Sequence, residues 1–152
     1  MAYIVVNLIF TILILFIGAG SVFAATVQIS NTPSQITDQP FNIDVNVSGA
    51  ASGINYLRAN LFPANTTKYF GFTFNGSTFI NSSDYSQYFP ITIPDTGTWS
   101  GTIQAKLDTT SSYYIGSGLY NLKVRRYTQS GSSYTWSNEA SLTINLSTPT
   151  PS

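Results

Sequence analysis

The side chains of this chain that could carry acid–base chemistry are six carboxylates, because the sequence has no histidine and no cysteine. They are Asp38, Asp44, Asp84, Asp95, Asp108 and Glu139. A Ser-His-Asp triad, a cysteine nucleophile and a zinc-thiolate site are therefore excluded. A glycosidase needs two carboxylates that face each other across a cleft, and no spacing among these six predicts one. We therefore expect a protein that is not an enzyme and that has no cofactor and no metal site.

A second candidate for chemistry is a cluster of positive charge in the stretch GLYNLKVRRY, residues 118–127, which holds Lys123, Arg125 and Arg126. In a strand, Lys123 and Arg125 face solvent, while Arg126 falls on the face of Val124 and, across the following turn, of Trp136. We predict that the Arg126 guanidinium stacks on the Trp136 ring, a contact worth about 0.5 to 2 kcal/mol. A basic edge that discourages strand pairing and a ligand-binding patch are the alternatives.

Four tyrosines in turn-rich stretches could bind a ligand by stacking. They are Tyr85, Tyr88, Tyr113 and Tyr114. Exposed aromatic rings stack on sugars, so these residues are a possible carbohydrate platform. Tyrosine also fills the cores and loop bases of sandwiches that are poor in aliphatic residues, because it tolerates half-burial. Exposure decides between the two interpretations.

Asparagine-linked glycosylation is a further possibility, because five sequons occur. Their acceptors are Asn46, Asn65, Asn75, Asn81 and Asn145. They matter only where the host glycosylates exported proteins.

The elements that must position these residues are strands. PFNIDVNV, residues 40–47, alternates apolar and polar side chains, and YLRANLF, residues 56–62, does the same. Asn75-Gly76 between two apolar runs predicts a hairpin. Pro90 cannot donate to a β-ladder, which places its strand at an edge or a bulge. Eight or nine short strands separated by turns predict an all-β, antiparallel sandwich.

Composition supports this class and excludes others. Charged residues make up 8% of the chain and aromatic residues 14%, a mixture that favours strands over helices. Six acidic and six basic residues cancel, so no global field attracts nucleic acid. We expect no nucleic-acid partner, and contact with a membrane only through the N-terminal segment.

The two ends of the chain differ from the middle. Residues 2–25 are uncharged and strongly apolar and end in small residues, which predicts an export helix and a signal peptide over residues 1–24. An uncleaved membrane anchor is the alternative, because the run is long enough to cross a bilayer. Residues 148–152 alternate Pro with Thr and Ser and predict a linker or tail, which leaves 25–147 as the folded domain.

Residues 117–122, SGLYNL, resemble the tyrosine corner of immunoglobulin-like and fibronectin-type-III-like domains. TPSQITDQPFNIDVNVSG, residues 32–49, is similar to the opening strands of bacterial-type immunoglobulin-like surface modules, and SNEASLTINL, residues 137–146, resembles their last strand. The resemblance implies that the Tyr120 hydroxyl bonds back to the backbone. Leu122 stands where antibody-type domains have a cysteine, so the resemblance is to the branch without a disulfide.

Taken together, these observations predict a secreted or cell-surface module, outside the cell or in the envelope, that serves as a structural spacer or adhesion domain. Its partner would be a surface protein or a glycan. The alternative function is a carbohydrate-binding module that uses exposed Tyr and Phe side chains.

Overall fold

The computed structural model describes residues 24–146, which form an all-β protein with two sheets and almost no helix. The elements are β1 (Thr26–Ser30), β2 (Gln35–Ile36), β3 (Phe41–Ser48), β4 (Gly53–Pro63), β5 (Phe72–Phe74), β6 (Phe79–Ile80), the 3₁₀ turn η1 (Tyr85–Gln87), β7 (Phe89–Ile93), β8 (Trp99–Lys106), β9 (Gly118–Thr128), β10 (Tyr134–Trp136) and β11 (Ala140–Ile144). The predicted export helix and the predicted linker lie outside the described residues, apart from Ala24.

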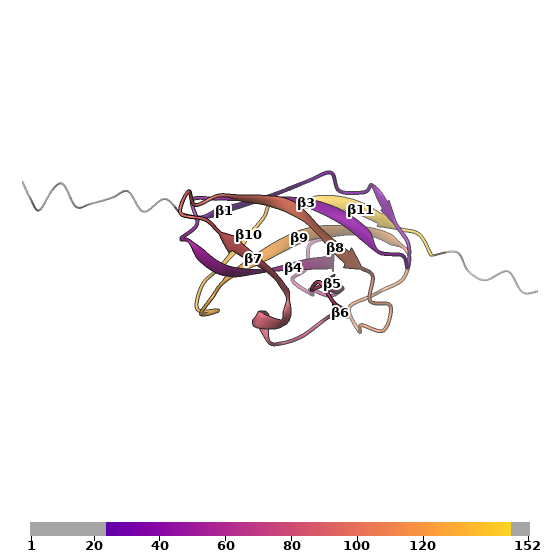
Figure 1. The fold of residues 1–152 in the computed structure, drawn as a ribbon. Coiled ribbons are helices and arrows are strands. Elements are labelled where there is room, and N and C mark those ends of the chain that lie inside the picture. The colour runs from indigo at the N-terminus through magenta and orange to yellow at the C-terminus, as the bar shows by residue number, and fades with distance from the viewer. Residues whose placement is uncertain (1–23, 147–152) are drawn as a thin grey trace, which may run out of the picture.

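The two sheets have the strand orders β1-β3-β8-β5-β6 and β2-β11-β9-β4-β7, with β10 also paired to β9. All pairings are antiparallel except that of β2 with β11. The arrangement is compatible with the predicted sandwich. Figure 1 shows the longer strands running along one axis of the molecule, with β1 starting at one end and the chain leaving β11 at the other.

Alternation along the strands builds the core, as the sequence predicts. In β3 the side chains of Ile43, Val45 and Val47 are buried, and the intervening side chains are exposed or half-buried. The inward face of β4 contributes Leu57, Ala59 and Leu61, and β8, β9 and β11 complete one apolar cluster between the sheets. Burying each of the larger aliphatic side chains stabilises the fold by roughly 1.5 to 3 kcal/mol.

The predicted hairpin is confirmed in part, and the predicted edge position of Pro90 is confirmed. β5 and β6 form the hairpin predicted at Asn75-Gly76, with Phe74 paired to Phe79. Only Gly76 has positive φ, however, and the Asn75 side chain accepts hydrogen bonds from the backbone N–H groups of Ser77 and Thr78. The loop is therefore longer than a two-residue type I′ turn. Pro90 lies in β7, the edge strand beside β4, as predicted.

The strand count differs from the prediction, since residues 24–146 contain eleven strands where eight or nine were expected. β2 and β6 have two residues each, too short to show a periodic pattern. The predicted last strand is also divided into β10 and β11. Trp136 pairs with Arg125, and Ala140 pairs with Leu122. From Trp136 to Ala140 the chain advances four residues, whereas the paired positions on β9 are only three residues apart. One extra residue is thus inserted, and side chains change face across this bulge.

The same bulge joins the two sheets at their edge. Asn138 accepts a hydrogen bond from the Ile29 N–H at 2.7 Å and donates one to the Ile29 carbonyl at 3.2 Å. Val27 of β1 also forms a parallel bridge with Ser137. These contacts occupy backbone groups of β1 that would otherwise form an open edge.

Candidate functional site

The outer face of the β4-β9-β10 region is covered by aromatic and cationic side chains. Because Leu57, Ala59 and Leu61 point into the core, the alternate positions of β4 point outward, and the pairing with β9 places outward positions of β9 beside them. We call this surface the aromatic face; its residues are Tyr56, Arg58, Phe62, Lys123, Arg125, Tyr127, Tyr134 and Trp136, with Tyr69, Tyr85 and Tyr88 packed on them from loops.

Arg125 lies at the centre of the aromatic face. Its guanidinium carbon is 3.9 Å from the centroid of the Trp136 ring and 4.8 Å from that of Tyr134. The rings of Tyr127 and Tyr69 lie at 5.6 and 5.7 Å, and Arg125 Nη1 donates to the Tyr127 hydroxyl at 3.1 Å. The cation is therefore stabilised by ring faces, since among residues 24–146 no carboxylate forms an ion pair with it.

Lys123 occupies the next outward position of β9. It forms an ion pair with Glu139, and its ammonium lies 5.4 Å from the Phe62 ring centroid and 5.9 Å from that of Trp136. Trp136 thus contacts two cations. The half-exposed ion pair contributes little by itself, because solvent screens such pairs.

The predicted stacking of Arg126 on Trp136 is wrong, because Arg125 takes that position. The register pairs Trp136 with Arg125 and Thr135 with Arg126, and directly opposed residues share a face. Arg126 points inward and is 4% exposed. Its Nε donates to Asn55 Oδ1 at 2.9 Å and its Nη1 to Thr135 Oγ1 at 3.3 Å. Burial lowers the pKa of this guanidinium from its ordinary value.

Two of the four predicted platform tyrosines belong to the aromatic face. Tyr88 is only 1% exposed, and its hydroxyl accepts from the Ser82 N–H and donates to the Ser82 carbonyl. Arg58 covers its ring at 5.1 Å, and burial raises the pKa of the Tyr88 hydroxyl. Tyr85 is half-buried against Tyr56 and Tyr127 and donates to the Gln129 carbonyl at 3.2 Å.

The other two platform tyrosines lie in the loop between β8 and β9. Tyr114 is half-buried beside Phe70 and Tyr120, with ring centroids 6.3 Å apart in both pairs, whereas Tyr113 is 42% exposed. Tyr120 is buried, and its hydroxyl donates to the Gly116 carbonyl at 2.9 Å and accepts from the Ile115 N–H at 3.0 Å. This is the backbone contact expected of a tyrosine corner, and burial raises the pKa of the Tyr120 hydroxyl.

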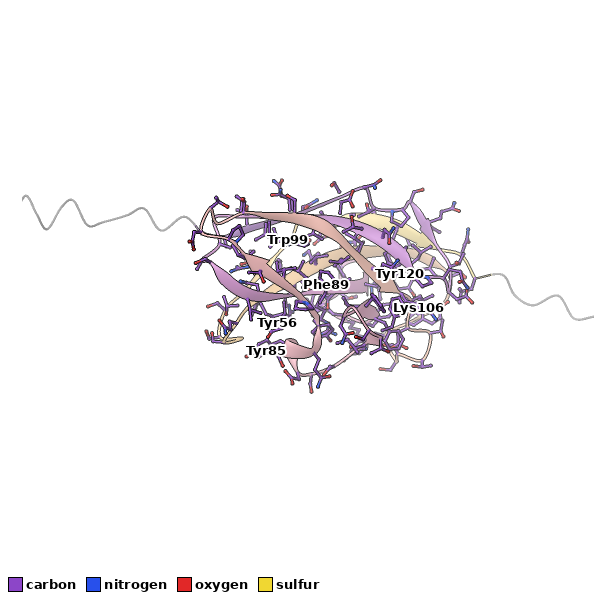
Figure 2. All side chains as sticks on the ribbon, viewed as in Figure 1. Tyr56, Tyr85, Phe89, Trp99, Lys106 and Tyr120 are labelled. Carbon is purple, nitrogen blue, oxygen red and sulfur yellow. The ribbon has the colours of Figure 1, made fainter. Side chains whose placement is uncertain are left out.

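The four tyrosines do not meet on one surface. Tyr85 contacts Gln129 just after β9, whereas Tyr114 packs beside Tyr120 near the start of β9. Figure 2 shows the labelled Tyr85 and Tyr56 close to each other and well separated from Tyr120. Because Tyr88 is buried and the remaining rings lie toward opposite ends of the molecule, the four tyrosines do not form one continuous stacking surface.

Sequence reasoning missed most of the aromatic face. The missed residues are Tyr56, Arg58, Phe62, Tyr69, Tyr127 and Tyr134. The outward alternation of Lys123, Arg125 and Tyr127 within one strand could have indicated part of it. Which loops would cover that alternation could not be read from the sequence.

Most carboxylates are held by neighbouring groups. Asp44 accepts from the Thr102 hydroxyl at 2.6 Å, and Asp108 accepts from the hydroxyl and N–H of Thr110. Asp84 caps η1, and hydrogen bonds from the Ser86 side chain and N–H lower the pKa of that carboxyl. Within residues 24–146, no group of three or more acidic side chains could hold a metal ion.

No protein-family model matches this chain, and a comparison with curated proteins finds no match. In the part of the chain that the structure describes, no helix has the length and apolarity to cross a bilayer. We therefore infer function from the arrangement of the residues themselves.

Proposed function

We propose that this chain is an exported, non-catalytic module with an immunoglobulin-like sandwich, and that it serves as a structural spacer or adhesion domain. The observation that carries the proposal is that the first and last described strands begin and end at opposite ends of the molecule (Figure 1). A module placed between two attached segments would hold them a full domain length apart.

The pairing register supports this separation. Thr26, the first residue of β1, pairs with Ser48, and the adjacent Val47 pairs with Trp99 at the start of β8. Ile144, the last residue of β11, pairs with Gly118 at the start of β9. The start of β9 lies at the end of the molecule where β8 finishes, which is opposite to the end where Thr26 lies. β9 has eleven residues. At about 3.3 Å per residue it spans roughly 36 Å, which sets the scale of the separation.

The segment around β2 is also tied to the last strand. Backbone hydrogen bonds of 2.9 Å join Thr143 to Ser34 and Asn145 to Ile36. Because β2 and β11 are parallel, tension that pulls Thr26 and Asn145 apart would shear these bonds together rather than open them one at a time. Such a load path suits a spacer.

The immunoglobulin-like assignment is supported by strand order. If β1, β3, β4, β5, β8, β9 and β11 are taken as strands A to G, the sheets contain A-B-E-D and G-F-C in the order of that family. Tyr120 lies near the start of β9, the strand that corresponds to F, and bonds back to Gly116 as a tyrosine corner does. β7, which returns to the edge beside β4 after β5, is an addition to the seven-strand pattern.

The non-catalytic character is supported by the chain's composition and by its acids. The sequence offers no histidine or cysteine as base or nucleophile. Asp44, Asp84, Asp108 and Glu139 each have hydrogen-bond or ion-pair partners that stabilise local structure. Carbohydrate binding through the four predicted tyrosines is not the preferred function, because their rings do not converge.

The spacer role can be tested by distance measurement, because the chain has no native cysteine. Spin labels on a Thr26→Cys and Asn145→Cys variant should give one narrow distance distribution near ~35 to 45 Å. A Thr26→Cys and Thr96→Cys variant is the control, since both residues lie at the same end, and it should give less than ~25 Å. A broad distribution, or a short distance for the first pair, would contradict a rigid spacer.

Export requires a separate measurement. Mass spectrometry of the protein made by an exporting host should give a mature N-terminus at Ala25. An intact Met1 on membrane-bound protein would instead support the uncleaved anchor.

A further inference from the structure

A pocket of about 340 Å³ lies at the end of the molecule where β4 begins and β9 finishes. It is lined by Ala51, Ser52, Ile54, Asn55, Arg126, Thr128, Gln129 and Ser130. The volume is within the range of pockets that hold small ligands. The lining comes from two separate turns and the ends of two strands, and it contains no acidic residue.

Arg126 is the charged group of this pocket, and most of its hydrogen-bonding capacity is unused by the protein. A guanidinium has five N–H donors. Two have partners, Asn55 Oδ1 and Thr135 Oγ1, so three have none among residues 24–146. Nη2 has no hydrogen-bond partner among the described residues, and Arg126 lines the pocket.

The charge of Arg126 is also uncompensated. The ion pair found among the described residues joins Lys123, on the outward face of β9, to Glu139 in the bulge between β10 and β11. Within residues 24–146, no aromatic ring stacks on Arg126, in contrast to Arg125. A buried charge without a counter-ion is unfavourable, and its cost is relieved when an anion with matching hydrogen-bond geometry enters.

We propose that this pocket binds a carboxylate group of a partner peptide, through the unused N–H donors of Arg126. A carboxylate matches the planar guanidinium, and two parallel hydrogen bonds fix its orientation. Ile54 and Ala51 line the pocket beside the charge, so they favour a carboxylate carried on a short apolar stem over a hydroxylated sugar acid. The Thr128 and Ser130 hydroxyls are engaged in hydrogen bonds within the β9-β10 turn, so Ser52 offers the hydroxyl for a neighbouring peptide group.

The pocket is preorganised by the aromatic face. Tyr85 donates to the Gln129 carbonyl and lies on the β9-β10 turn, where a Cβ on Gly131 would come 2.1 Å from its Cε1 atom. Gly131 has a φ of 67°, so both the conformation and the space require glycine. A turn held in this way keeps Gln129 and Ser130 in place before a ligand arrives, which reduces the entropy lost on binding.

This inference does not rest on the spacer role, and the two fail in different experiments. The test is a titration of the folded domain with acetate, the minimal carboxylate on an apolar stem, followed by the ¹H and ¹⁵N resonances of Arg126 Nε–H and of the Asn55, Gln129 and Ser130 amides. Sodium chloride at the same ionic strength is the reference. We expect saturable shifts confined to the pocket with acetate and no saturation with chloride.

Two variants at exposed loop positions keep the test independent of folding. Ser130→Glu places a carboxylate at the pocket itself, where it should compete with acetate and weaken binding by about tenfold or more. Ser112→Glu makes the same charge change at an exposed position of the loop between β8 and β9, outside the pocket, so acetate binding should persist. Equal binding by the two variants would overturn the proposal.

The ligand class is tested with three further probes. N-acetylalanine carries a peptide-like carboxylate and should saturate the same shifts at lower concentration than acetate. Glucuronate binding more tightly than N-acetylalanine would overturn the peptide assignment in favour of an acidic sugar. Sulfate binding more tightly than both would overturn the carboxylate assignment.

Discussion

Removal of the Tyr120 hydroxyl is the sharpest test of how the loop between β8 and β9 is held. The hydroxyl lies at the base of this loop and makes two backbone contacts, to the Gly116 carbonyl at 2.9 Å and the Ile115 N–H at 3.0 Å. The Tyr120 ring is buried against Phe70 and Tyr114, with centroids 5.7 and 6.3 Å away. Tyr120→Phe keeps these ring contacts and deletes only the two hydrogen bonds.

The expected loss of stability follows from those two contacts. A net intramolecular hydrogen bond is worth about 1 kcal/mol, and a buried group left without a partner costs about 1 to 3 kcal/mol. Gly116 and Ile115 lie toward solvent, so water can replace part of what they lose. We therefore expect Tyr120→Phe to lower the free energy of unfolding by about 2 kcal/mol. For a domain of this size, that corresponds to a melting temperature lower by roughly 6 to 10 °C.

Urea and thermal unfolding followed by circular dichroism measure this change. The matched control is Tyr134→Phe, because Tyr134 is 57% exposed and its hydroxyl makes no hydrogen bond among the described residues. That variant should change the free energy of unfolding by less than about 0.5 kcal/mol. Equal effects of the two substitutions would refute the reasoning that the Tyr120 hydroxyl holds the loop.

The same variant should alter the response to alkaline pH. Burial raises the pKa of Tyr120 above its ordinary value of about 10, so the unfolded chain loses this proton first as pH rises. The contribution of this group to stability is fully present below pH ~10 and is lost above it, at up to ~1.4 kcal/mol per pH unit. Above pH ~10, the free energy of unfolding of Tyr120→Phe should therefore fall less steeply with pH than that of the parent protein. An unchanged alkaline slope would contradict this assignment.

The remaining predictions concern the aromatic face and the sequons. In double-mutant cycles of unfolding free energy, Arg125→Met and Trp136→Ala should couple by about 0.5 to 2 kcal/mol. Arg126→Met and Trp136→Ala should instead be additive within about 0.5 kcal/mol. Coupling of Trp136 to Arg126 but not to Arg125 would contradict the observed register. In a host that glycosylates exported proteins, mass spectrometry should find a glycan on Asn65, which is exposed in a turn with a φ of 61°. Asn75 should remain unmodified, because its amide nitrogen donates to the Gln87 carbonyl and its side-chain oxygen accepts hydrogen bonds from two backbone N–H groups. Modification of Asn75 alone would show that these bonds do not protect it.

The aromatic face and the buried arginine show where strand parity succeeds and where it fails. Parity within β9 correctly placed Arg126 inward and Lys123 and Arg125 outward, because side chains alternate strictly along an extended backbone. Parity carried across the turn to Trp136 gave the wrong partner. The turn between Thr128 and Ser133 and the bulge at residues 137–139 set the register there, and neither has a signature in the alternation of apolar residues.

The all-β class, the alternating core, the edge strand at Pro90 and the hairpin at Asn75-Gly76 are predictable from the sequence, since these features depend on local chemistry and a period of two. The folded arrangement was needed to show which strands are neighbours, that Arg125 rather than Arg126 contacts Trp136, and that Tyr88 is buried. It also left the guanidinium of Arg126 beside a pocket without a counter-ion. The physical reason is that burial and pairing depend on residues far apart in the chain, such as Asn55 and Arg126, whose meeting is fixed by packing between strands rather than by sequence spacing.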